Sequence, residues 1–243
     1  MYDELLDNWR NKKKQKNKIF VFSFINNSIL DIYKDFDIDV YRFDLYEFAL
    51  LNGYRDINRI SRKEILPLIN RIPDFKKEKN LSKLIAVDLP LTEIFGEENF
   101  SLQNIIDFYS KSKADLLILN IDHNILGLTN KLSKIKIPTI IYSKNNLKTN
   151  NNDYLETMQT KLIESESQGT LMILAENYPQ SFISNIKNAV SIPVVCNLKN
   201  NKVDGYYARF SAVFGLVDSE ENRYLNLSDL IHDGVEDYMK DIK

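Results

Sequence analysis

The sequence predicts an α/β fold of the (β/α)8 TIM-barrel class with an N-terminal helix, and three observations support this prediction. Eight short runs, most of them rich in Ile, Val and Leu, recur along the chain, as in parallel strands that are buried on both faces. Longer amphipathic segments lie between them, which is typical of βαβ units. No Pro-, Gly- or Ser-rich linker interrupts the 243 residues, so we expect a single domain over residues 1–243. An open doubly wound sheet is the alternative.

The elements follow in a regular order. The first is a surface helix within residues 2–18, because Leu5, Leu6 and Trp9 have helical spacing. Its lysine-rich run at 12–16 is interpreted as a solvated helix end, with an anion or nucleic-acid site as the alternative. The predicted strands are residues 19–24, 38–43, 84–89, 116–121, 137–142, 171–175, 193–198 and 210–216. Helices are expected over 101–112, 153–167 and 180–190.

The composition excludes several classes of function. The net charge of −2 provides no basic field for nucleic acid. The chain contains no run of about 18 apolar residues and no apolar leader, so we expect a cytoplasmic protein without a membrane partner. The single cysteine, Cys196, rules out an internal disulfide and a paired-cysteine metal site. The glycines are too far apart for a phosphate-binding loop.

Polar residues stand where the predicted strands end, which is where the chemistry of an α/β barrel is located. They are Asp44, Asp88, Asn120 with Asp122, Tyr142 and Glu176. Carboxylates are preferred ligands of hard cations such as Mg²⁺, and a separate carboxylate can act as a general base. An Asp at such a position can equally cap the following helix, and this alternative stays open.

Several motifs in the second half of the chain belong together. They are Leu171-Met-Ile-Leu-Ala-Glu176, Ser191-Ile-Pro-Val-Val195, Val203-Asp-Gly205 and Ala212-Val-Phe-Gly-Leu216, preceded by Val87-Asp88-Leu89-Pro90. On these motifs the sequence resembles the ketopantoate hydroxymethyltransferase family, in order and over nearly the whole chain.

The resemblance implies a (β/α)8 barrel that assembles into a homo-oligomer. It also implies transfer of a hydroxymethyl group from methylene-tetrahydrofolate to the keto acid α-ketoisovalerate in pantothenate biosynthesis, with Mg²⁺ as cofactor. Asp44 and Asp88 match the metal-binding aspartates of the family, and Glu176 matches its general base. Substrate contacts are expected from Asn120, Asp122 and Tyr142.

The chain departs from the family pattern at several positions. The lysine and glutamate of the fourth strand are replaced within 118–120, and a glycine-rich loop is replaced at 196–200. In one interpretation Asp122 supplies the missing carboxylate, and Lys144 or Lys199 the missing cation. In another, the barrel is a non-catalytic homologue that serves as a binding or assembly protein. A related enzyme acting on another keto acid is a third. Tyr207 is expected to pack against an outer helix.

Overall fold

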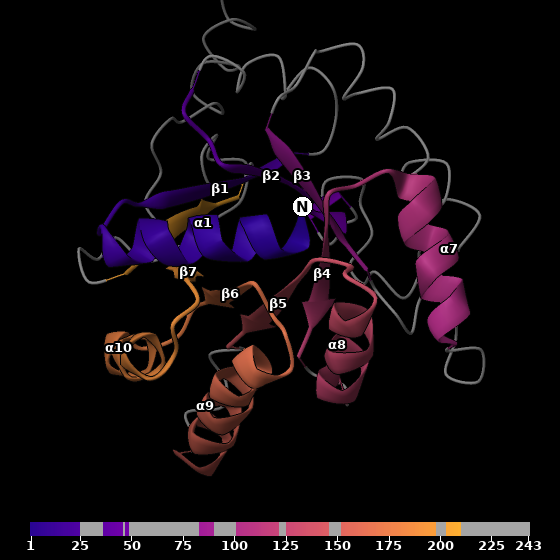
Figure 1. The fold of residues 1–243 in the computed structure, drawn as a ribbon. Coiled ribbons are helices and arrows are strands. Elements are labelled where there is room, and N and C mark those ends of the chain that lie inside the picture. The colour runs from indigo at the N-terminus through magenta and orange to yellow at the C-terminus, as the bar shows by residue number, and fades with distance from the viewer. Residues whose placement is uncertain are drawn as a thin grey trace, which may run out of the picture.

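The computed structural model contains a closed parallel barrel whose eight strands pair in chain order, β8 closing onto β1. It describes residues 1–24, 36–45, 47–48, 83–89, 101–121, 125–145, 152–197 and 203–209. Helices lie around the outside of the strands (Figure 1). The predicted (β/α)8 class is therefore confirmed, and the open sheet is excluded.

The elements agree closely with the sequence prediction, apart from the last strand and a helix over residues 125–134 that the prediction does not name. The strands are β1 (Ile19–Phe24), β2 (Val40–Phe43), β3 (Leu84–Asp88), β4 (Leu116–Asn120), β5 (Thr139–Lys144), β6 (Met172–Glu176), β7 (Val194–Cys196) and β8 (Gly205–Ala208). The helices are α1 (Tyr2–Lys14), α7 (Leu102–Ser112), α8 (Ile125–Lys134), α9 (Asn152–Ser167) and α10 (Gln180–Ala189). The barrel takes its eighth strand from 205–208, ahead of the predicted run 210–216, which lies outside the described residues. Among the described helices, none is long and apolar enough to cross a bilayer.

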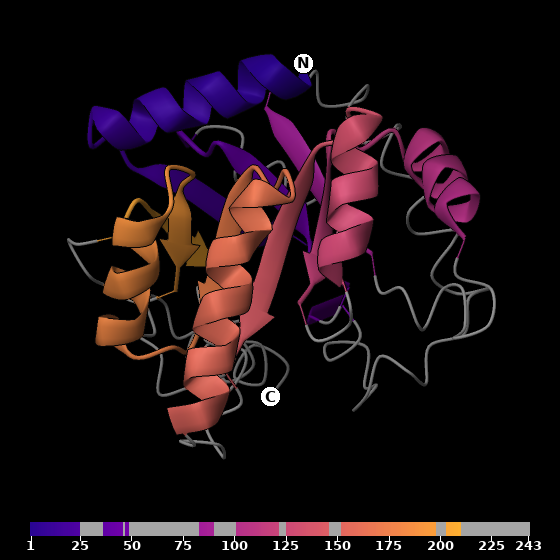
Figure 2. The same ribbon diagram turned by 60° about the horizontal axis from the view of Figure 1, so that its bottom comes forward.

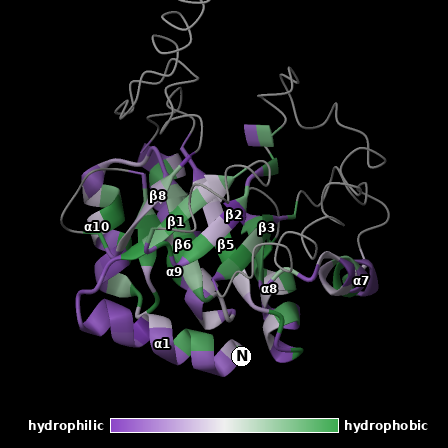
Figure 3. Ribbon diagram, turned by 90° about the horizontal axis from the view of Figure 1, so that it is seen from above, coloured by the Kyte–Doolittle hydropathy of each residue, from purple (hydrophilic) through white to green (hydrophobic). Residues whose placement is uncertain are grey.

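The inner side of the barrel changes from apolar to polar along the strands. Residues two apart in a strand face the same side, so Arg42 follows buried Val40 inward on β2, and Asp88 follows buried Ala86 inward on β3. Figure 3 shows the hydrophobic strands at the centre and the more hydrophilic α1 along the edge. The polar side chains therefore gather towards the carboxyl ends of the strands.

Helix α1 covers the other end of the barrel. Figure 2 shows it lying across the end where the strands begin, while the arrowheads point away from it. Trp9 holds it in place with only 2% of its surface exposed, and the Tyr2 hydroxyl donates to the Gly169 carbonyl at 2.5 Å. This arrangement leaves the carboxyl ends of the strands as the place for a site.

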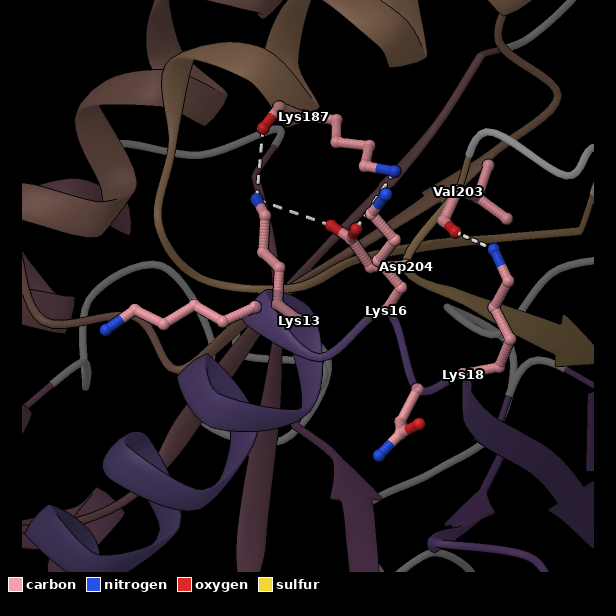
Figure 4. A pocket seen from close by; sticks show the side chains of 8 residues that line it. Lys13, Lys16, Lys18, Lys187, Val203 and Asp204 are labelled. Atoms are coloured by element: carbon pink, nitrogen blue, oxygen red, sulfur yellow. Dashed lines mark hydrogen bonds and ion pairs between the residues drawn. The ribbon is translucent and has the colours of Figure 1, made fainter.

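The lysine-rich run is only partly the solvated helix end that the sequence predicts. Lys13 Nζ donates to the carbonyls of Lys187, Val190 and Ile192 at 2.7–3.0 Å, and it lies 3.3 Å from the carboxylate of buried Asp204. In Figure 4, Lys13 and Lys187 meet at Asp204. The Lys13 ammonium thus satisfies carbonyls at the carboxyl end of α10, where positive charge is favourable.

Candidate active site

Two aspartates and an arginine form a buried group at the carboxyl ends of β2 and β3. Arg42 is the third residue of β2, Asp44 directly follows that strand, and Asp88 is the last residue of β3. Their exposed fractions are 0%, 0% and 2%. The structure therefore brings together the two residues that sequence analysis assigns to a metal, with an arginine between them.

The Arg42 guanidinium binds Asp88 through two parallel hydrogen bonds. Nε donates to Oδ1 at 2.9 Å and Nη2 donates to Oδ2 at 3.0 Å. Nη1 lies 3.7 Å from Asp44 Oδ2. The guanidinium carbon also lies 4.2 Å from the ring centre of Tyr142 and 5.0 Å from that of Tyr207. A planar guanidinium suits both contacts, the paired oxygens and the aromatic faces.

Every oxygen of the two aspartates already accepts a hydrogen bond. Besides Arg42, Asp88 Oδ2 accepts from the Leu45 backbone N–H at 3.2 Å. Asp44 Oδ1 accepts from the Glu47 N–H at 2.9 Å, and Oδ2 accepts from the Tyr207 hydroxyl at 2.7 Å. Tyr207 therefore points into the barrel, and the prediction that it packs against an outer helix is wrong. Its side chain faces inward on β8, where it contacts Asp44 and the Arg42 guanidinium.

The environment separates the acidities of the two aspartates. Burial opposes ionisation of Asp44, but the charges of Arg42 and Arg209 and the hydrogen bonds from Tyr207 and Glu47 outweigh it, and its pKa falls to about 2. For Asp88, burial together with the charge of Asp44 outweighs the attraction of Arg42, and its pKa rises to about 7. A single guanidinium thus keeps Asp44 ionised, while the second aspartate, Asp88, is protonated more readily than an ordinary aspartate.

Glu176 ends β6 and is buried against three donors. Its Oε2 accepts from the Tyr142 hydroxyl at 2.6 Å and from Arg209 Nη2 at 2.7 Å, and its Oε1 lies 3.2 Å from Lys144 Nζ. Tyr142 joins this group to the aspartates, since its ring contacts Arg42 while its hydroxyl binds Glu176. The carboxylates from β2, β3 and β6 therefore belong to one connected polar cluster.

The remaining predicted residues lie beside this cluster or outside the described chain. Asn120 lines a cavity of about 10 Å³ with Asp88, Leu89, Ile118 and Tyr142, which is space for about one water molecule. Asp122 and Lys199 lie outside the described residues. Lys144, one of the two lysines proposed as a replacement for the lost cation, lies beside Glu176.

The described side chains do not fit a divalent cation between Asp44 and Asp88. Mg²⁺ needs direct contact with oxygens at about 2.0–2.1 Å, but these oxygens carry the hydrogen bonds given above, three of them from or beside a positive guanidinium. Among the described residues, no three His, Cys, Asp or Glu side chains are grouped so as to hold a metal. The oxygens of the two aspartates are instead bound by an arginine, a tyrosine hydroxyl and two backbone N–H groups.

Three residues of the cluster were missed by sequence analysis, namely Arg42, Tyr207 and Arg209. One signal could have found Arg42: it lies two residues before Asp44 in an otherwise apolar strand, so both side chains must face the same side. Tyr207 lies on β8 and Arg209 directly follows that strand. Because they are two residues apart, their side chains are expected on the same side. The expected eighth strand at 210–216 hid that signal.

The chain is similar to known proteins both in sequence and in fold. A family model described as ketopantoate hydroxymethyltransferase matches residues 5–243. The 3-methyl-2-oxobutanoate hydroxymethyltransferase of Campylobacter curvus (strain 525.92) is 24% identical over 179 residues, which cover 67% of this chain and 65% of that protein. The chain thus matches just under two thirds of the length of this curated relative.

Three solved structures are similar in fold. A putative phosphonomutase from Burkholderia cenocepacia J2315 has a TM-score of 0.62 at 11% identity, covering 85% of this chain and 92% of that chain. Phosphonopyruvate hydrolase in complex with oxalate and Mg²⁺ gives 0.60 at 10%, covering 84% and 79%. The 2,3-dimethylmalate lyase, a member of the PEP mutase/isocitrate lyase superfamily, gives 0.59 at 10%, covering 86% and 81%. At these identities the likeness concerns the fold alone.

Because the family model matches nearly the entire chain, this protein belongs to the ketopantoate hydroxymethyltransferase family.

Proposed function

We propose that this protein transfers a hydroxymethyl group to a small 2-keto acid at the carboxyl end of its barrel. The proposed acceptor is α-ketoisovalerate and the proposed donor is methylene-tetrahydrofolate, as family membership suggests. The observation that carries the proposal is the buried Glu176, joined through Tyr142 to the pair formed by Asp88 and Arg42. Assembly into a homo-oligomer is proposed from family membership alone.

Glu176 is the base in this proposal. It accepts the proton from C3 of the keto acid, the C–H electron pair forms a C2–C3 double bond, and the keto π electrons move to the oxygen. Water hydrolyses the methylene group of the folate, so that both of its carbon–nitrogen bonds break, each nitrogen takes up a proton and formaldehyde is formed. The enolate carbon attacks the formaldehyde carbon, and the resulting alkoxide takes the proton from Glu176 to become the hydroxyl group. Positive charge near the keto oxygen favours removal of the C3 proton, because it stabilises the negative charge that develops on that oxygen.

The donors on Glu176 suggest how the base becomes available. Arg209 and Lys144 neutralise Glu176 in the absence of substrate. A keto acid brings its own carboxylate, and guanidinium and ammonium groups bind such an anion well. If Arg209 and Lys144 transfer to that carboxylate, Glu176 loses both of these cationic partners, and its oxygens are free to accept a proton. The proposal therefore couples binding of the substrate to activation of Glu176.

Deuterium exchange tests the first step without the folate. In D₂O, proton NMR follows the methyl doublet of α-ketoisovalerate, which collapses to a singlet when the C3 proton is replaced. We expect exchange above the buffer rate with the wild-type protein and none with Glu176→Gln. The matched control is Glu164→Gln, an exposed glutamate on α9. Formation of the hydroxymethylated product on adding methylene-tetrahydrofolate then tests the second step.

A non-catalytic binding or assembly role is the second candidate, and specific observations favour it. Arg42 already neutralises the aspartates, and the cavity beside Asp88 and Tyr142 holds about one water. This role predicts no exchange with any small 2-keto acid, although the wild-type chain is folded. Exchange with another keto acid but not with α-ketoisovalerate would instead support the related enzyme.

A further inference from the structure

The position between Asp44 and Asp88 is taken by a positive side chain of the protein itself. Two carboxylates from neighbouring strands converge there, which is an arrangement expected to attract a cation. The Arg42 guanidinium lies between them, with its Nε and Nη2 on Asp88 and its Nη1 towards Asp44. The charge that a metal ion would bring to this point is therefore already present.

The surroundings of Arg42 fix its side chain in place. It is fully buried, and the rings of Tyr142 and Tyr207 both lie against its guanidinium. The Tyr142 hydroxyl is bound to Glu176 and the Tyr207 hydroxyl to Asp44. A metal ion could take the position only if Arg42 left the two aspartates and both aromatic rings. Removing a buried guanidinium from paired carboxylates in this way is costly.

We propose that Arg42 is the resident cation of this site in place of a divalent metal, so that the pair Asp44 and Asp88 binds no Mg²⁺ in the native protein. The inference deepens the proposed function, and only its catalytic part rests on that function. Arg42 Nη1 is a buried donor without a hydrogen-bond partner among the described residues. It is the group that would donate to the keto oxygen as negative charge develops there.

Metal titration tests the inference without any assay of activity. Mn²⁺ is added to the full-length protein, free Mn²⁺ is counted by electron paramagnetic resonance, and the thermal midpoint is recorded with and without the ion. For the wild type we expect no site and no shift of the midpoint. In Arg42→Val the aspartates lose their cation, so we expect a new Mn²⁺ site that binds about tenfold or more tightly than any in the wild type. It should be accompanied by a rise in midpoint.

Two further variants make the result specific. Arg42→Val combined with Asp88→Asn should lose the new site, because one of its carboxylates is gone. Arg10→Val removes an arginine from α1, which lies across the opposite end of the barrel, and this variant should bind Mn²⁺ as the wild type does. If Arg42→Val does not fold, Arg42→Lys replaces it: this variant preserves the charge and should also exclude Mn²⁺. The wild-type titration by itself still shows whether the two aspartates bind the ion.

The outcomes separate this inference from the proposed function. A tight wild-type Mn²⁺ site that is lost in Asp44→Asn and Asp88→Asn overturns the inference, whatever the exchange assay gives. Absence of that site, together with its appearance in Arg42→Val, supports the inference even if no keto acid undergoes exchange. In that case it is the proposed function that fails. Exchange that persists in EDTA and is lost in Arg42→Lys supports both.

Discussion

At the scale of single residues, the cluster is organised by one arginine shared between two acids. Arg42 has bidentate geometry with Asp88 but only a longer contact with Asp44, whereas Asp44 is compensated by hydrogen bonds from Tyr207 and the Glu47 backbone. Different compensation for the two carboxylates explains why their pKa values move in opposite directions. The same pair consequently makes stability depend on pH in two separate ranges.

The raised pKa of Asp88 predicts a loss of stability with rising pH. In the unfolded chain this carboxyl ionises near its ordinary value of 3.8, while in the fold its pKa is about 7. Between these values the folded state holds more protons, so the free energy of unfolding falls as pH rises from about 4 to about 7. Asp44, with its pKa lowered to about 2, acts below this range and loses its contribution as pH falls from 3.8.

Urea unfolding of the wild type and of Asp88→Asn across this range measures the effect. The difference in unfolding free energy between the two proteins should shift in favour of the variant as pH rises, because Asn does not titrate. Parallel curves for the two proteins would mean that Asp88 ionises in the fold as it does in the unfolded chain.

At the scale of elements, strand β8 closes the barrel through a position that only glycine fits. A Cβ added to Gly205 would lie 2.2 Å from the backbone oxygen of Ile19 on β1, and backbone cannot move aside as a flexible side chain can. Gly205 and Ile19 are paired in the ladder between β8 and β1. The close approach of the two strands therefore depends on the missing side chain.

Gly205→Ala should lower the free energy of unfolding by about 1–3 kcal/mol, the usual cost of an inserted group in a packed region. Gly127 offers a matched control in helix α8, because a Cβ there meets nothing within 4 Å. Gly127→Ala should be neutral or stabilising by up to about 1 kcal/mol. Chemical denaturation of both variants makes the comparison, and equal stability of the two would contradict the role given to Gly205.

The polar cluster shows which parts of the site the sequence could predict. Asp44, Asp88 and Glu176 were found because carboxyl ends of parallel strands meet at one end of a barrel, a rule that needs only the strand boundaries. Arg42 does not follow from this rule, because it lies within β2 at an inward position below the strand end. The hydrogen bonds from Tyr207 and Arg209 depend on the position of β8, and the apolar run at 210–216 predicts this strand several residues too late.

At the scale of the whole molecule, the two ends of the barrel differ: helix α1 covers the amino-terminal end, and the polar cluster lies at the carboxyl-terminal end. The fold class was predictable because the alternation of apolar runs and amphipathic segments is repeated along the chain, so that errors at single boundaries do not alter it. The packing of α1 across the amino-terminal end was not predictable, since its lysines read as a solvated surface. In the structure Trp9 is buried there, and it packs α1 against the residues inside the barrel.

Trp9→Ala should therefore destabilise the protein by about 3–5 kcal/mol, as large-to-small changes at buried aromatic positions do. Phe36→Ala is the control, because Phe36 has 59% of its surface exposed and should change stability by about 0.5 kcal/mol at most. Thermal or urea unfolding measures both. Similar losses for the two variants would contradict the stabilising role given to Trp9.

Glu176 is proposed to enolise a small 2-keto acid beside a resident arginine. The most direct measurement is deuterium exchange at C3 of α-ketoisovalerate, followed by proton NMR with EDTA and, separately, with added Mg²⁺. We expect exchange at the same rate in both conditions and its loss in Glu176→Gln. Exchange that requires Mg²⁺, or exchange that survives Glu176→Gln, would contradict this proposal.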